Sequence, residues 1–195
     1  RKIIVNPNNS NEILACGVSG MYRSTDAGVS WTLMNSGLFW DMVQDPNSPN
    51  ILYAATGWVA NANAGSVAIY KSTNFGLNWN LLTTGIPGTG TVQRVKLAIA
   101  PYDPNYVYAI TTDLFGGLHG IYKTVNAGSN WSYISPALNI LEWDEGFNSG
   151  GQGTYDIGAV VSQSNRDVIY VGGINLWGST DGGNNFDPES HWTLS

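Results

Sequence analysis

The 195-residue sequence has few charged residues, one cysteine and no long apolar run. Asp, Glu, Lys and Arg make up 11% of the chain, well below the ~25% usual for soluble domains. Fourteen acidic residues against eight Lys and Arg give a net charge of −6. A nucleic-acid-binding domain carries a basic face, and here the cations are scattered along the sequence. We therefore predict no basic patch and no nucleic-acid partner.

The single cysteine, Cys16, lies in an apolar segment and forms no intrachain disulfide. We interpret it as a buried small apolar residue. No apolar run approaches the ~18 residues of a membrane-spanning helix, which predicts no membrane span. The sequence opens at Arg1, in strand-like residues and without Met, so we expect a processed chain or a piece of a longer one.

An eight-residue pattern, Ser/Thr-x-Asp/Asn-x-Gly-x-x-Trp/Phe, occurs four times, at 24–31, 72–79, 124–131 and 179–186. A repeat of about 40–50 residues is typical of β-propeller blades. The defining residues are Ser24, Asp26, Gly28 and Trp31; Ser72, Asn74, Gly76 and Trp79; Thr124, Asn126, Gly128 and Trp131; and Ser179, Asp181, Gly183 and Phe186.

Each repeat contains three short strand-like segments before the pattern and a fourth after it, and none shows a helical period. This predicts an all-β fold, a β-propeller of four-stranded antiparallel blades. The blades are expected at about 1–37, 38–86, 87–137 and 138–195 of a single domain, 1–195. The fourth strand of the last blade, after Phe186, is expected to be irregular.

The chemistry of the repeated pattern is that of a tight turn. The Asp or Asn oxygen can accept a backbone N–H two residues on, the Gly suits a positive φ, and the aromatic residue can insert between neighbouring sheets. Two of the four copies carry Asn in place of Asp. Because an amide caps a turn but cannot serve as a catalytic base, we predict a structural role.

These octets resemble Asp-box (BNR) repeats, which occur in sialidases, xyloglucan-degrading glycoside hydrolases, photosystem-assembly factors and sortilin-type receptors. The resemblance covers nearly the whole chain. It implies that the octets lie at the blade periphery, away from the substrate face. Such propellers generally have more than four blades. We therefore expect part of a larger propeller, completed by blades or domains of a longer polypeptide or by another chain; a compact four-bladed ring is the alternative.

A second resemblance, over residues 151–183, is to propellers of large secreted bacterial surface proteins, many of them exported by the type IX route. It implies an extracellular or cell-surface location in a bacterium. The sialidase resemblance does not extend to activity, because the chain has only four Arg and no Arg-Ile-Pro motif.

Aligning the turns that follow the first strand of each repeat places Lys2, Asp41, Lys96 and Ile157 at matching positions around the predicted channel. Arg94 and Asp156 lie one or two residues from this ring. Trp40 and Tyr155 offer flat surfaces for sugar stacking. The ligand-binding candidates are therefore Trp40, Arg94, Lys96, Trp143 and Tyr155.

A glycosidase needs two carboxyl groups roughly 5–10 Å apart. Asp41 and Asp156 form the best pair, and Asp144 and Glu145, in the irregular segment 138–154, are the other catalytic candidates. The run from Glu142 to Glu145 could bind Ca²⁺, but it matches no defined calcium loop. We predict no cofactor and no metal site, and we place His119 and His191 on surface loops, too isolated to bind zinc.

Two functions follow. The first is a non-catalytic extracellular binding or scaffold module, a rigid propeller that presents loops to a protein or glycan partner. The alternative is an Asp-box glycoside hydrolase that cleaves polysaccharide with paired carboxylates.

Overall fold

The computed structural model describes residues 1–57, 67–86 and 92–192. These residues form four antiparallel sheets of four strands, with strand order following the chain in each sheet, and one helical turn, α1 (Gly153–Asp156). The predicted all-β fold is confirmed. No helix in the described ranges is long and apolar enough to cross a membrane.

The strands of each sheet fall within one of the four predicted repeat ranges. The first sheet contains β1 (Lys2–Asn6), β2 (Asn9–Gly17), β3 (Gly20–Ser24) and β4 (Thr32–Asn35). The second contains β5 (Phe39–Gln44), β6 (Leu52–Thr56), β7 (Ile69–Ser72) and β8 (Asn80–Leu82). The third contains β9 (Arg94–Ile99), β10 (Val107–Thr112), β11 (Leu118–Thr124) and β12 (Ser132–Ile134). The fourth contains β13 (Gly158–Val161), β14 (Ile169–Gly172), β15 (Leu176–Ser179) and β16 (Asp187–Ser190), with a register shift between β15 and β16.

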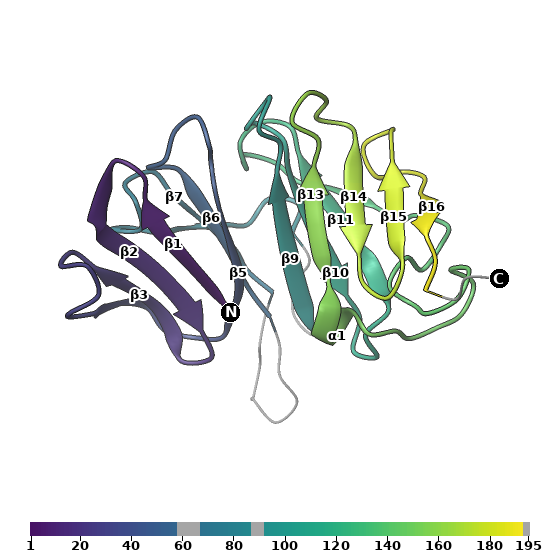
Figure 1. The fold of residues 1–195 in the computed structure, drawn as a ribbon, viewed down its shortest axis with the longest axis horizontal. Coiled ribbons are helices and arrows are strands. Elements are labelled where there is room, and N and C mark those ends of the chain that lie inside the picture. Colours follow the sequence, from purple (N-terminus) through teal and green to yellow (C-terminus); the bar gives the residue numbers. More distant parts are fainter. Residues whose placement is uncertain (58–66, 87–91, 193–195) are drawn as a thin grey trace.

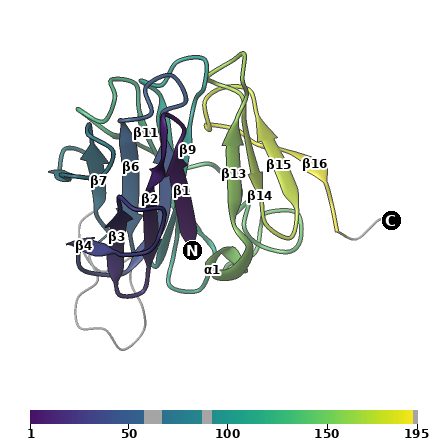
Figure 2. The same cartoon turned by 60° about the vertical axis from the view of Figure 1, so that its left-hand side comes forward.

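The four sheets stand side by side in an open arc. The first strands contact one another in order, β1 with β5, β5 with β9 and β9 with β13. The first and fourth sheets lie at opposite ends of the molecule (Figure 1), and Figure 2 shows β4 and β16 on opposite sides. A closed four-bladed ring would bring these sheets together, so that alternative is wrong.

The hydrophobic core lies between the sheets, because side chains alternate between the two faces of each strand. One buried cluster joins the first and second sheets through Leu14 and Met42. Another joins the second and third through Tyr53 and Leu97, and a third joins the third and fourth. Cys16 is buried in the first cluster, as predicted, and burial raises the pKa of its thiol to about 11.

The repeated octet forms the same turn in all four copies, shown here for the second. The Ser72 hydroxyl accepts hydrogen bonds from the amides of Asn74 (3.3 Å) and Gly76 (2.9 Å). The Asn74 side-chain oxygen accepts from the amide of Asn78, at 2.9 Å. The predicted two-residue reach of the Asp/Asn oxygen is therefore wrong. The hydroxyl makes that bond, and the Asp or Asn reaches four residues on.

Two successive residues of the octet adopt positive φ. The glycines Gly28, Gly76, Gly128 and Gly183 have φ of 89°, 73°, 89° and 92°, as predicted. The residue before each of them also has a positive φ, and it is alanine or phenylalanine in the first three copies. This non-glycine strain is tolerated because the hydroxyl and the Asp/Asn oxygen fix the turn from both sides.

The aromatic residue that ends the octet differs in burial along the chain. Trp131 and Phe186 are each 5% exposed and belong to the clusters between sheets, and Trp79 packs against the first cluster. Trp31 is 42% exposed. The predicted insertion between sheets therefore occurs in the last three copies, and Trp31 lies on a face that no described sheet covers.

Candidate binding site

A cleft of about 380 Å³ opens where the first strands of the sheets meet, and we call it the inner cleft. The start of β1, the start of β5, the start of β9 and the turn α1 each contribute to its lining. The lining residues are Arg1, Lys2, Trp40, Asp41, Arg94, Val95, Lys96, Thr154 and Tyr155.

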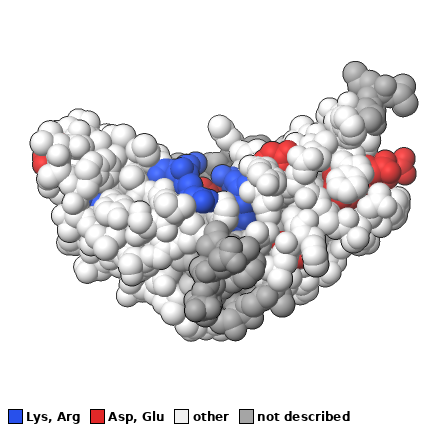
Figure 3. Space-filling model, turned by 90° about the horizontal axis from the view of Figure 1, so that it is seen from below, with Lys and Arg blue, Asp and Glu red and all other residues white. Residues whose placement is uncertain are grey.

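Half of the chain's Lys and Arg residues meet in the inner cleft. Arg1, Lys2, Arg94 and Lys96 line it, and Lys and Arg side chains gather in the hollow of the arc in Figure 3. The prediction that the scattered cations form no basic patch is therefore wrong. The cations come from residues 1–2 and from β9, which are far apart in the sequence, and both β1 and β9 contact β5.

The Trp40 ring contacts two guanidinium groups. The Arg1 guanidinium carbon lies 3.9 Å from the ring centroid and that of Arg94 lies 5.2 Å away, both within the range of a cation–π contact. Arg94 also donates to the carbonyl of Gly153, at 3.3 Å. Burial lowers the pKa of Arg94, while Asp41 and Asp156 act in the opposite direction. An arginine stays protonated under these conditions, so the positive charge of the cleft is fixed.

Asp41 is 3% exposed and its Oδ2 is already engaged. The oxygen accepts from Lys96 Nζ, at 2.9 Å, and from the backbone amide of Leu97, at 3.0 Å. These contacts tie β5 to β9. The pairing offsets one of the four positive charges of the cleft.

The turn α1 closes one side of the inner cleft. Tyr155 lines the cleft and is 84% exposed. Asp156 is exposed at the end of the same turn. Its negative charge acts on one of the cleft's cations, Arg94. The structure thus brings together the predicted Trp40, Arg94, Lys96 and Tyr155.

Three lining residues, Arg1, Val95 and Thr154, were not proposed from the sequence. Arg1 could have been found because it immediately precedes Lys2, a member of the aligned ring. Thr154 could not, because it depends on how the segment 138–154 folds back onto β9.

The loop carboxylates lie in a different place, which we call the outer cleft. This cleft has a volume of about 510 Å³ and is lined by Leu138, Asp144, Glu145, Phe147, Trp177, Pro188 and His191. Trp143, 47% exposed, accepts a hydrogen bond at its carbonyl from the Trp192 indole, at 2.6 Å. The inner and outer clefts share no lining residue, so the four candidate carboxylates do not form one group.

Glu142 organises the loop that carries these residues. Its buried carboxylate accepts from the backbone amides of Asp144, at 2.8 Å, and Gly146. The oxygens proposed for Ca²⁺ are therefore used in part by the loop's own N–H groups. Within the described ranges, no group of three or more His, Cys, Asp or Glu is arranged to hold a metal ion.

His119 does not lie on a surface loop. It belongs to β11 and contacts the rings of Tyr122 and Tyr133, with centroids 6.4 Å and 6.0 Å away. Burial lowers the pKa of this imidazole, which favours a neutral, structural histidine.

Comparison with known proteins gives structural matches only. No protein-family model and no curated protein sequence matches the chain. An ancestral GH74 enzyme matches with a TM-score of 0.66 and 21% identity over 95% of this chain and 23% of its own. The GH74 enzyme of Niastella koreensis matches with a TM-score of 0.65 and 23% identity, over 98% of this chain and 29% of its own.

Other similar structures belong to different proteins of the same fold. YCF48 bound to D1 peptide matches with a TM-score of 0.54 and 17% identity, covering 97% of this chain and 52% of its own. Sialidases also match. All these identities are low, so the structural likeness establishes the fold alone. The chain is a partial β-propeller, an arc of four blades that spans about a quarter of the GH74 chains it matches.

Proposed function

We propose that this arc is a non-catalytic extracellular binding module that holds a carboxylated glycan in the inner cleft. The observation that carries the proposal is the convergence of four of the chain's eight cations on one hollow of a protein with net charge −6. Local positive potential of this kind attracts an anionic ligand. Arginine offers paired N–H donors that match a carboxylate.

The aromatic residues favour a sugar as the rest of the ligand. Trp40 and Tyr155 border the cations, and Tyr155 is almost fully exposed without a core role. Such rings present large apolar surfaces at a polar site. Structural neighbours that are glycoside hydrolases and sialidases support a glycan ligand, and an extracellular location is proposed on the same ground.

The alternative remains a glycoside hydrolase with Asp41 and Asp156 as its carboxylates. Asp41 argues against it, because its Oδ2 is held by Lys96 and Leu97. The outer-cleft carboxylates, Asp144 and Glu145, line a separate surface with none of the four inner-cleft cations.

The test is calorimetric titration of the chain with tetragalacturonate, with cellotetraose as the neutral control. We expect salt-dependent binding of the acidic sugar only. Arg1→Met and Tyr155→Ala alter exposed side chains and should each weaken binding about tenfold, the effect of ~1.4 kcal/mol. Arg166→Met, which removes a guanidinium paired with Asp103 instead, should leave binding unchanged.

Equal binding of both sugars, or no binding, would overturn the proposal. Release of reducing ends that Asp156→Asn abolishes would establish the hydrolase instead.

A further inference from the structure

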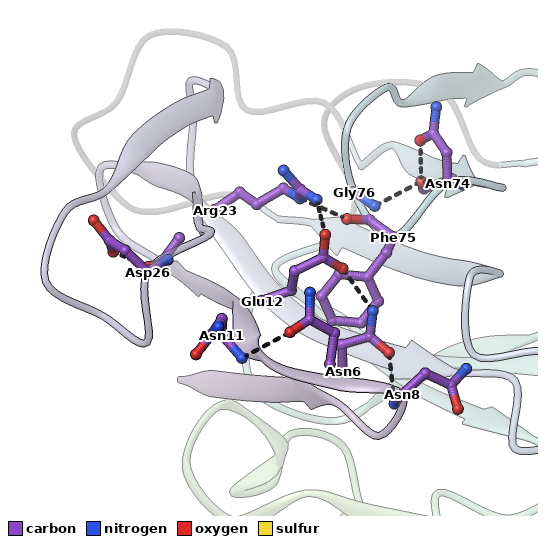
Figure 4. Close-up of polar contacts among 12 residues, drawn as sticks. Asn6, Asn8, Asn11, Glu12, Arg23, Asp26, Asn74, Phe75 and Gly76 are labelled. Carbon is purple, nitrogen blue, oxygen red and sulfur yellow. Dashed lines mark hydrogen bonds and ion pairs between the residues drawn. The ribbon is translucent and has the colours of Figure 1, made fainter.

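A cation links each of the first two sheets to the Asp-box of the next. The residue directly before the octet is Arg23 in the first sheet and Lys71 in the second. Arg23 Nε donates to the carbonyl of Phe75, at 3.1 Å (Figure 4). Lys71 Nζ donates to the carbonyl of Ala127, at 2.7 Å. Phe75 and Ala127 are both the fourth residue of the following octet.

The third sheet has a cation in the same place. Lys123 precedes the third octet and its ring neighbour is Tyr108, with Nζ 5.8 Å from the centroid. The ammonium reaches Gly182, the fourth residue of the last octet, so closely that a Cβ built there would lie 2.6 Å from Nζ. A cation therefore lies against the fourth octet residue of the next sheet at all three junctions, and at the first two it donates to the carbonyl of that residue.

The octet glycines form the second part of each junction. A Cβ on Gly76 would meet Leu14, and one on Gly128 would meet Tyr53 and Leu82. A Cβ on Gly183 would lie 3.5 Å from Ile121. Leu14, Tyr53 and Ile121 each belong to the preceding sheet, and each covers the octet of the following sheet. All three glycines are buried.

Among the described residues, nothing occupies the receiving half of this junction in the first sheet. A Cβ on Gly28 would meet only Trp31 and Ile13 of its own sheet, and Ala27, the fourth residue of the octet, is exposed. Ile3 is 69% exposed.

The exposure of Ile3 is unusual for its place in the register. Ile3 pairs with Ala15, Met42 with Ala54 and Leu97 with Ala109, so the three residues are equivalent. Met42 is 0% and Leu97 1% exposed, because a preceding sheet covers them.

We propose that the open face formed by Ile3, Ala27, Gly28 and Trp31 binds a further four-stranded blade that carries Lys or Arg directly before its own Asp-box. That cation donates to the Ala27 carbonyl, as Arg23 does to Phe75. Apolar side chains of the same blade cover Ile3 and the ring of Trp31, as the first sheet covers Met42 and Trp79.

A second copy of this chain is the wrong occupant. The face it would present is that of its fourth sheet, where Gly178 stands in place of the cation. The Glu189 side chain fills the space above Gly178, so this face offers an anion, not a cation, to the Ala27 carbonyl.

The test introduces Ile3→Cys into the full chain and measures the rate at which the thiol reacts with a maleimide. The other cysteine, Cys16, is buried. A copy of residues 38–91, which includes Lys71, is then fused before residue 1 as the probe blade. We expect at least a 100-fold slower reaction in the fusion. Lys71→Met in the added copy should make the slowed thiol reaction of the fusion about tenfold faster. Thr73→Ala in the copy, which changes an exposed neighbour, should alter the rate less than twofold.

Light scattering and circular dichroism accompany each rate. The unfused chain should be monomeric, with a fast-reacting thiol. A fusion that reacts as fast as the unfused chain would show that the face binds no blade. An unfused chain that dimerises and protects the thiol would make a second copy the occupant. Full protection of the thiol in a fusion with Lys71→Met in the copy would show that the blade binds without the cation.

Discussion

The Ser72 hydroxyl should contribute more to stability than its counterpart in the first sheet. Replacing Ser72 with Ala removes the acceptor for the amides of Gly76, which is buried, and Asn74, which is half-buried. A buried N–H left without a partner costs about 1–3 kcal/mol. We expect Ser72→Ala to lower the free energy of unfolding by about 2–4 kcal/mol. The half-buried Asn74 amide contributes less to this cost than the buried Gly76 amide, because water can reach it.

Ser24→Ala is the matched variant, because Ser24 makes the same two bonds. Gly28 is only half-buried and Ala27 is exposed, so water can replace the lost acceptor and the expected cost is ~1 kcal/mol or less. Thr73→Ala, an exposed hydroxyl beside Ser72, should change stability by less than ~0.5 kcal/mol.

The assay is equilibrium unfolding in urea, followed by far-ultraviolet circular dichroism and by tryptophan fluorescence. Coincident transitions would justify a two-state treatment. The reasoning is refuted if Ser24→Ala and Ser72→Ala cost the same full amount, or if Ser72→Ala matches Thr73→Ala.

Three further predictions follow from the same contacts. Hydrogen bonds lower the pKa of Asp26, chiefly through Ser30, and of Asp181, chiefly through Asn185, to about 2 from the ordinary 3.8. Their stabilising effect is present above pH ~4 and lost as pH falls toward 2. Asp26→Asn with Asp181→Asn should therefore lower the melting temperature at pH 6, flatten its dependence on pH between 4 and 2, and match the parent chain near pH 2. Asp41→Asn should cost about 2–3 kcal/mol in urea unfolding because it leaves Lys96 without its partner, and Asp41→Asn with Lys96→Met should cost less than the single change; additive costs would contradict the pairing. Cys16, whose pKa burial raises to about 11, should react with a disulfide reagent at pH 8 at least ~100-fold more slowly in the folded chain than in urea, since thiolate and access are both reduced; similar rates would contradict its burial.

The fold could be predicted from the sequence because its signal repeats. Four copies of the octet, each after a short strand, place the sheets and their turns. The positive φ at Gly28 and its counterparts was predictable because glycine favours it. The hydrogen-bond reach of Asp26 was not, because the Ser24 hydroxyl accepts from the Gly28 amide two residues on and Asp26 accepts from the Ser30 amide instead.

The site could be predicted only in part. Aligning the repeats brought Asp41 and Lys96 to one ring, and they form an ion pair in the structure. The basic character of the cleft was missed because its cations come from two segments remote in sequence, residues 1–2 and β9. The loop carboxylates Asp144 and Glu145 were proposed only as further candidates, since no repeated pattern indicates how the segment 138–154 folds, and they line the outer cleft.

The most direct test of the account is the affinity of the full chain for tetragalacturonate, measured by calorimetry beside the Arg1→Met and Arg166→Met variants. Binding in the inner cleft should weaken with salt, fall about tenfold with Arg1→Met and stay unchanged with Arg166→Met. Equal loss in both variants would mean that the ligand responds to net charge alone, and would contradict a site in the inner cleft.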